Sequence, residues 1–154
     1  MKERILVSAC LLGKNCKYNG KNNLNENLMK SISEKEIIEV CPEVMGGLSI
    51  PRVPSEIEYG KSGIDVIEGN ARVVTKDGND VTKEFKKGAY KTLEIVIKNK
   101  IKLAILKESS PSCGSTFIYN GCFNSTKKRA MGVTTALLTS NNIKVVNENF
   151  DNIE

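Results

Sequence analysis

The sequence contains no histidine and no tryptophan among its 154 residues. Without histidine, a Ser–His–Asp triad, imidazole acid–base chemistry and histidine metal ligands are all excluded. Long apolar runs are missing too: none approaches the roughly 20 residues that a membrane-spanning helix needs, so a membrane is not indicated as a partner. The first residues lack the apolar segment of a signal peptide, and we therefore expect a cytoplasmic protein.

Arginine is scarce, with four Arg beside 19 Lys in a chain of net charge +5. Dispersed lysine is typical of a solvated surface, whereas nucleic-acid grooves tend to cluster arginine and aromatic side chains. The one compact basic run is Lys127-Lys128-Arg129. We interpret it as a solvated loop, with contact to an anionic ligand as the alternative. The composition therefore does not favour nucleic acid as a partner.

Short apolar segments alternate with helical patterns along the chain. We expect strands over 4–9, 36–40, 102–106 and 143–146, a β-hairpin built from 64–67 and 71–75, and helices over 24–32, 80–100 and 131–138. This alternation predicts an α/β fold, with a mostly parallel sheet flanked by helices (Rossmann-like) and an added β-hairpin. The length suits a compact single domain over residues 1–154.

Cysteines follow three of the expected strands. The chain has five cysteines, an odd number that disfavours a closed set of disulfides, so reduced thiols are expected. Cys10, Cys41 and Cys113 each come just after a strand, and parallel strands bring their carboxyl ends to one sheet edge. Three thiolates without imidazole suit an iron–sulfur cluster or zinc. With three protein ligands, a cubane cluster keeps one iron open, and an open metal position is typical of catalytic sites.

Four local motifs carry a family resemblance. They are Val7-Ser8-Ala9-Cys10-Leu11-Leu12-Gly13, Val40-Cys41-Pro42-Glu43-Val44-Met45-Gly46-Gly47-Leu48, Lys107-Glu108-Ser109-Ser110-Pro111-Ser112-Cys113-Gly114 and Gly132-Val133-Thr134. With them in this order, the chain resembles the thiouracil desulfidases, formerly a domain-of-unknown-function family, over nearly its whole length. The resemblance implies an enzyme that removes sulfur from a thiolated pyrimidine base, a small-molecule substrate.

The resemblance also implies a set of site residues. It implies a [4Fe–4S] cluster held by Cys10, Cys41 and Cys113, whose fourth iron is free to take the substrate sulfur. It gives Glu43 an acid–base role and Ser110 a role in positioning the substrate or relaying a proton. The structural alternatives are that Glu43 accepts backbone N–H groups of the following Gly-Gly turn and that Ser110 caps the turn before the next proline.

The residues themselves agree with hydrolytic chemistry. A thiocarbonyl sulfur is soft and suits an open iron, which polarises the carbon toward attack by water. Glu43, two residues after a candidate ligand, is placed to activate that water or to protonate a ring nitrogen. Ser110, Ser112 and Arg52 are candidates for contacts with the substrate. Arg52 can instead pair with the carboxylate of Glu56.

The two remaining cysteines leave alternatives open. Cys16 is a candidate for a thiol beside the cluster, a spare ligand or a sulfur acceptor, whereas we interpret Cys122 as a packing residue. A competing hypothesis is a zinc-stabilised binding module in which Cys16 completes a closed site of four cysteines. A third is a metal-free cysteine nucleophile that a lysine or a helix N-terminus activates in place of histidine.

Overall fold

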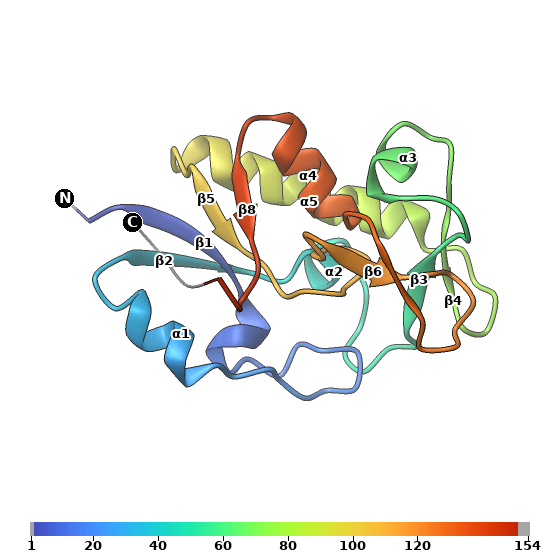
Figure 1. Ribbon diagram of the computed structural model, residues 1–154, viewed down its shortest axis with the longest axis horizontal. Coiled ribbons are helices and arrows are strands. Elements are labelled where there is room, and N and C mark those ends of the chain that lie inside the picture. Colours follow the sequence, from blue (N-terminus) through green and yellow to red (C-terminus); the bar gives the residue numbers. More distant parts are fainter. Residues whose placement is uncertain (1, 151–154) are drawn as a thin grey trace.

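A parallel sheet of four strands forms one half of the molecule in the computed structural model, which describes residues 2–150 (Figure 1). Its strands, in spatial order, are β2 (Glu36–Val40), β1 (Arg4–Ser8), β5 (Leu103–Ile105) and β8 (Lys144–Val146). Every neighbouring pair in it is parallel. The expected mostly parallel sheet is confirmed, and each of the four predicted strands is present within one residue of its predicted ends.

Helices cover both faces of this sheet. Side chains alternate along β1, so Leu6 packs toward α4 (Thr82–Lys98) and α5 (Val133–Ser140). Val7 points the other way, into the core beside α1 (Glu26–Ser31). Burial on both faces explains why the strands read as continuous apolar runs rather than as alternating ones. Within residues 2–150, no helix is long and apolar enough to cross a membrane.

The long helix α4 begins and ends within two residues of its predicted bounds. The N-cap residue is Val81 and not Asp80, the residue that the sequence suggests; the Asp80 side chain accepts from the backbone N–H of Thr82 at 2.9 Å but makes no cap. Phe85, Ala89 and Val96 are buried on the face of α4 that packs against the rest of the molecule. The sequence pattern places Ile97 on that face as well, but it is 64% exposed although the preceding residue, Val96, is buried.

The other half of the molecule consists of two antiparallel hairpins around a second core. The hairpins pair β3 (Ser55–Ile57) with β4 (Val73–Thr75), and β6 (Phe117–Tyr119) with β7 (Lys127–Arg129). Their buried side chains meet Phe85 of α4. In Figure 1 this half lies to the right of the parallel sheet, with the carboxyl ends of β1 and β5 directed toward it.

Three expectations for this half were wrong. The segment 64–67 is not a strand but helix α3 (Gly63–Ile67), because Ser62 and Asp65 form a reciprocal capping box that starts a helix. The true partner of β4 is therefore β3, which two preceding prolines made difficult to recognise. The basic run 127–129 is strand β7 and not a solvated loop.

A short helix after β2 contacts α4 through glycine. Helix α2 (Pro42–Met45) begins with a proline, which suits the first turn of a helix. A Cβ atom on Gly46 would overlap the carbonyl oxygen of Glu84, and one on Gly88 would overlap the carbonyl oxygen of Pro42. The two backbones therefore touch directly, which fixes the position of the segment that carries Cys41 and Glu43.

Candidate functional site

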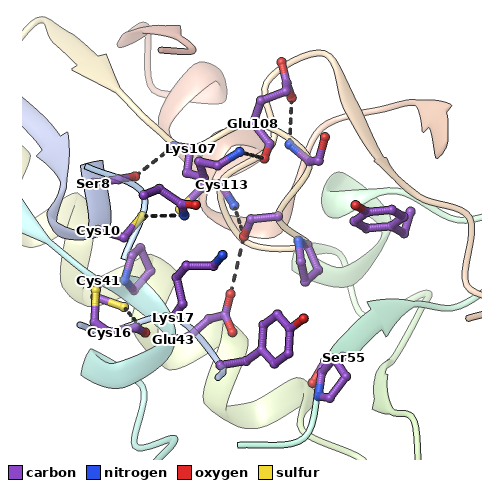
Figure 2. Close-up of a pocket in the computed structure, with 18 of the residues that line it drawn as sticks. Ser8, Cys10, Cys16, Lys17, Cys41, Glu43, Ser55, Lys107, Glu108 and Cys113 are labelled. Atoms are coloured by element: carbon purple, nitrogen blue, oxygen red, sulfur yellow. Dashed lines mark hydrogen bonds between the residues drawn. The ribbon is translucent and has the colours of Figure 1, made fainter. Parts of the chain in front are cut away.

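The structure brings the three strand-end cysteines to one cavity of about 550 Å³ at the carboxyl edge of the sheet (Figure 2). Cys10 lies in the single-turn 3₁₀ helix η1 (Ala9–Leu12) that follows β1, and Cys41 is the N-cap residue of α2. Cys113 lies in the turn after β5, closed by a hydrogen bond from the N–H of Gly114 to the carbonyl of Ser110. Residues 31 and 72 positions apart along the chain thus share one site.

A fourth thiol, that of Cys16, lines the same cavity. It is buried, and interaction with it shifts the pKa of the Cys10 and Cys41 thiols. Its backbone carbonyl accepts from Arg52 Nη2 at 3.0 Å and from Cys41 Sγ at 3.7 Å. Of the roles that the sequence left open, the position beside the other two thiols favours a direct effect on them.

These contacts favour the thiolate form of two cysteines. The hydrogen bond from Cys16 lowers the pKa of Cys10 to about 7 against the opposing effect of burial, and the side-chain amide of Asn23, 3.5 Å from the sulfur, lowers it further. The same donor lowers the pKa of Cys41 to about 7, helped by the backbone N–H of Val44. The pKa of Cys16 is raised in return. Thiolate is the form that binds metals.

Cys113 is electrostatically different. Burial raises the pKa of its thiol well above the ordinary range, and the negative charges of Glu43 and Cys41 add to the effect. A metal bound at this sulfur must therefore displace a proton. The site combines two sulfurs that ionise near neutral pH with one that is held as a thiol until a cation arrives.

A buried ion pair lies next to the thiols. Arg52 Nε lies 3.1 Å from Glu43 Oε1, and both side chains are largely buried, at 9% and 17% exposure. Two more guanidinium nitrogens donate to the carbonyls of Ser49 and Cys16. Arg52 thus pairs with Glu43 and not with Glu56, the partner that the sequence suggested. The predicted contact between Arg52 and a substrate stays a prediction.

The second carboxylate oxygen of Glu43 accepts from the hydroxyl of Ser110 at 3.3 Å. The Ser110 oxygen in turn accepts from the backbone N–H groups of Ser112 and Cys113, each at 3.1 Å. Ser110 therefore caps its own turn and also donates to Glu43. The Glu43 side chain is engaged by Arg52 and Ser110 rather than by the Gly-Gly turn.

Ser112 does not line the cavity. Its side chain is buried, and its hydroxyl lies 2.7 Å from Thr134 Oγ1 in helix α5. The predicted contact between Ser112 and a substrate therefore has no support in this geometry. The residue instead fixes the cysteine turn to α5, where Thr135 Oγ1 also donates to the carbonyl of Cys113 at 2.8 Å.

Glu108 organises the same turn, which sequence reasoning did not anticipate. Burial alone would raise the pKa of its carboxyl, but hydrogen bonds from the backbone N–H groups of Phe117 and Thr116, with others from Asn147 and Ser109, lower it to about 2. The position of Glu108 inside a motif was the only available signal. The carboxylate gathers N–H groups on both sides of Cys113 and so closes the loop around it.

Hairpin β6–β7 forms the facing wall of the cavity. The lining residues of this hairpin are Tyr119, Phe123, Ser125 and Lys127. The buried carboxylate of Glu56 in β3 holds the hairpin in place by accepting from the backbone N–H groups of Gly121 and Phe123, at 2.9 and 3.2 Å. Cys122 lies in the same loop but its side chain is exposed, so the expectation that it packs in the core was wrong.

The donor set fits an iron–sulfur cluster better than a single metal ion. Among residues 2–150, no group of three or more histidine, cysteine or acidic side chains is placed so that it could hold one ion. In a cluster, each thiolate binds a different iron, so the ligands surround a volume rather than a point. The cavity lined by Cys10, Cys41 and Cys113 provides that volume with soft sulfur donors. The closed zinc site is not favoured.

Comparisons with known proteins agree on one family. A model of the 2-thiouracil desulfurase family matches residues 5–149. The uncharacterized protein YbbK of Bacillus subtilis (strain 168) is 48% identical over 145 residues, which cover 94% of this chain and 95% of that protein. The solved structure of the [4Fe-4S]-dependent thiouracil desulfidase TudS is similar with a TM-score of 0.81 and 40% identity, covering 96% of this chain and 91% of that chain.

Proposed function

Because the chain belongs to the 2-thiouracil desulfurase family, we propose that it is a [4Fe–4S]-dependent thiouracil desulfidase that replaces the sulfur of a thiolated pyrimidine base by oxygen. One observation carries the proposal beyond family membership. Three cysteines from three separate strand ends share a cavity with the Glu43–Ser110 pair. Soft sulfur donors and a proton-transfer pair in one cavity are what a desulfidase needs.

Cys10, Cys41 and Cys113 would hold the cluster. When bound by three protein ligands, such a cluster supplies a soft Lewis acid with one open position for the substrate sulfur. The parallel sheet contributes rigidity, because β1 and β2 are paired along five residues and carry two of the ligands at their ends. Glu43 offers oxygen rather than sulfur and so serves protons rather than iron.

Hydrolysis determines which protons must be transferred. Water adds its oxygen to the ring carbon, the carbon–sulfur bond breaks, and both hydrogen atoms of the water leave with the sulfur as hydrogen sulfide. The Glu43 carboxylate accepts a proton from the attacking water, which makes the oxygen a better nucleophile. Arg52 keeps this carboxylate oriented, and the hydroxyl of Ser110 supplies the short path by which the proton moves on.

The substrate is a small thiolated nucleobase bound between the two walls of the cavity. Arg52 and Ser110 line it together with the cysteines, and Tyr119 and Phe123 line it from the hairpin. The reaction suits the cytoplasm, where thiols stay reduced.

The test is anaerobic. Protein purified without oxygen should contain about four iron and four sulfide per chain, absorb broadly near 400 nm, roughly as thiolate-bound iron does, and release sulfide from 2-thiouracil or 4-thiouracil in a single turnover. The Cys122→Ser variant is the matched control, since its exposed side chain lies outside the cavity lining. Protein with stoichiometric zinc and no iron, or iron-loaded protein that releases no sulfide, would overturn the proposal.

A further inference from the structure

The ammonium group of Lys17 is a feature of the cavity that the proposed function leaves unused. Lys17 lies in the loop between η1 and α1 and lines the cavity. We propose that Lys17 binds the substrate, by donating a hydrogen bond from its ammonium group to the ring carbonyl oxygen that a thiouracil carries in addition to its sulfur. The inference rests on the proposed function, since it requires a thiolated pyrimidine in this cavity.

The side chain of Lys17 is half-buried and directed inward. Figure 2 shows it extending into the cavity, with its ammonium end inside the group of labelled residues that surround the space. Among residues 2–150, no ion pair includes this ammonium group. A cation that is partly removed from water without a partner loses solvation free energy, so the position favours a ligand that supplies an acceptor.

The other cations of the cavity lining are either paired or exposed. Two of them form ion pairs at 3.1 and 2.9 Å, Arg52 with Glu43 and Lys107 with Glu148. The remaining two, Lys76 and Lys127, are exposed to solvent. Within the part of the chain that the structure describes, Lys17 is therefore the cavity cation that combines partial burial with the absence of a carboxylate partner.

The fold fixes the backbone on both sides of Lys17. The carbonyl of Cys16 accepts from Arg52 Nη2 at 3.0 Å, and the carbonyl of Tyr18 accepts from the backbone N–H of Arg52 at 2.7 Å. Arg52 is itself paired with Glu43. One residue thus sets the position of the proposed proton acceptor and of the Lys17 backbone, so the two groups have a defined place relative to each other.

The class of ligand follows from the chemistry of the donor. A lysine ammonium has N–H donors and no acceptor, so it binds an oxygen and not a ring N–H group. A thiouracil offers a carbonyl oxygen, ring N–H groups and a sulfur. The soft sulfur suits the proposed open iron, which leaves the oxygen for the ammonium group. Contacts at both groups fix the orientation of the ring, and therefore the position of the thiocarbonyl carbon relative to Glu43.

The experiment compares two thiones that differ by this oxygen, 4-thiouracil and pyrimidine-4-thione. Anaerobic sulfide release from the iron-loaded protein gives kcat/KM for each thione. The variant is Lys17→Met, which keeps an unbranched side chain and removes the charge. Lys21→Met is the matched control, because Lys21 is exposed in the same loop and does not line the cavity. The intrinsic reactivity of each thione cancels when the ratio of the two is compared between proteins.

We expect Lys17→Met to keep its iron and to lose about 10- to 100-fold in kcat/KM with 4-thiouracil, as is typical of a lost hydrogen bond from a charged group. With pyrimidine-4-thione, the variant and the wild type should be nearly equal, because this substrate lacks the oxygen that Lys17 would contact. Lys21→Met should behave as the wild type with both thiones.

Three results would overturn the inference. An equal loss with both thiones would mean that Lys17 acts on the cavity as a whole, and unchanged kcat/KM with 4-thiouracil would mean that it does not bind the substrate. Loss of iron in Lys17→Met would mean that the residue supports the cluster instead. An iron-loaded wild type that releases no sulfide from either thione would contradict the proposed function itself, so the two failures are distinguishable.

Discussion

The two walls of the cavity are built by different means. The wall at the parallel sheet carries Cys10, Cys41 and Cys113 on turns that follow strands, each fixed by several hydrogen bonds. The facing wall comes from hairpin β6–β7, a narrow ribbon that carries aromatic and basic side chains but no cysteine in the cavity. A single buried carboxylate, that of Glu56, ties the tip of this hairpin to β3.

The difference indicates a division of labour. Chemistry requires groups held to within a fraction of an ångström, and strand ends in a packed sheet provide that precision. Recognition of a flat heterocycle tolerates more movement, and a hairpin supplies surface without the same rigidity. Changes on the sheet wall should therefore abolish chemistry, whereas changes on the hairpin wall should alter substrate affinity.

The largest effect is expected from the proposed cluster ligands of the sheet wall. Replacing Cys41 by Ser should reduce iron content and turnover to near zero, because a hydroxyl is a poor ligand for iron at neutral pH. Cys122→Ser on the hairpin should change neither quantity. Iron analysis and sulfide release from one sample measure both. A Cys41→Ser protein that keeps a full complement of iron would contradict the proposal that Cys41 is a cluster ligand.

Next in size is the loss of Glu43, the proposed proton acceptor. Glu43→Gln keeps the shape of the side chain and its contact with Arg52 but removes the negative charge. We expect normal iron and absorbance, with turnover lower by about two orders of magnitude or more, as is typical for a general base. Single-turnover sulfide release measures the loss. Turnover near that of the wild type would reduce Glu43 to a structural residue.

In the metal-free protein, the cysteines of the sheet wall should differ in how their thiol reactivity depends on pH. The pKa values of Cys10 and Cys41 are lowered from 9.0 to about 7. Each thiol therefore ionises as the pH rises through 7, and at pH 7 about 50-fold more thiolate is present than at an ordinary cysteine. Alkylation by iodoacetamide should level off above pH 7 at these residues, while buried Cys113 stays unreactive. A midpoint near 9 would contradict the expectation.

A smaller loss is expected at Ser110. Its hydroxyl donates one hydrogen bond to Glu43, and Ser110→Ala removes it while leaving the carboxylate paired with Arg52. A bond of this kind contributes about 1.4 kcal/mol, so turnover should fall about tenfold with unchanged iron. A loss as large as that of Glu43→Gln would mean that the hydroxyl acts directly on the substrate.

The smallest effect is expected on the hairpin wall. Glu56→Ala removes the acceptor of two backbone N–H groups, so the loop from 120 to 125 should loosen and its amides should exchange faster with solvent. We expect KM to rise by less than about tenfold, since water replaces the lost acceptor, with kcat and iron unchanged. Glu58→Ala, which removes a partly exposed carboxylate that comes after the same strand and pairs with Arg72 rather than with the hairpin, is the control. A fall in kcat instead of a rise in KM would show that the hairpin takes part in chemistry.

The sequence predicted the sheet wall far better than the hairpin wall. Strand β2 was predicted to the residue, because its apolar run ends sharply at a cysteine and a proline. The cysteines at three strand ends then met as parallel topology requires. By contrast, the partner of β4 was assigned to the wrong segment. A short helix and a strand of the same length can have similar apolar content, and the segment 64–67 is part of such a helix.

Side-chain partners were the least predictable part of the site. The Arg52–Glu43 pair and the Ser112–Thr134 contact join residues whose proximity depends on how helices and turns pack, and local pattern carries no information about that. The role of Cys16 stayed open for the same reason. Its six-residue spacing from Cys10 does not reveal which side of a loop faces the cavity.

The glycine contact between α2 and α4 has a consequence for how the protein tolerates change. Gly88 lies on α4, and yet it fixes the position of Glu43 on α2, because the two backbones touch there with no side chain between them. Flexible side chains can repack to absorb an added atom, but a carbonyl oxygen cannot. Position 88 should thus be as intolerant of substitution as the cavity residues. Mutational sensitivity should therefore extend from the cavity to the face of α4 that contacts α2.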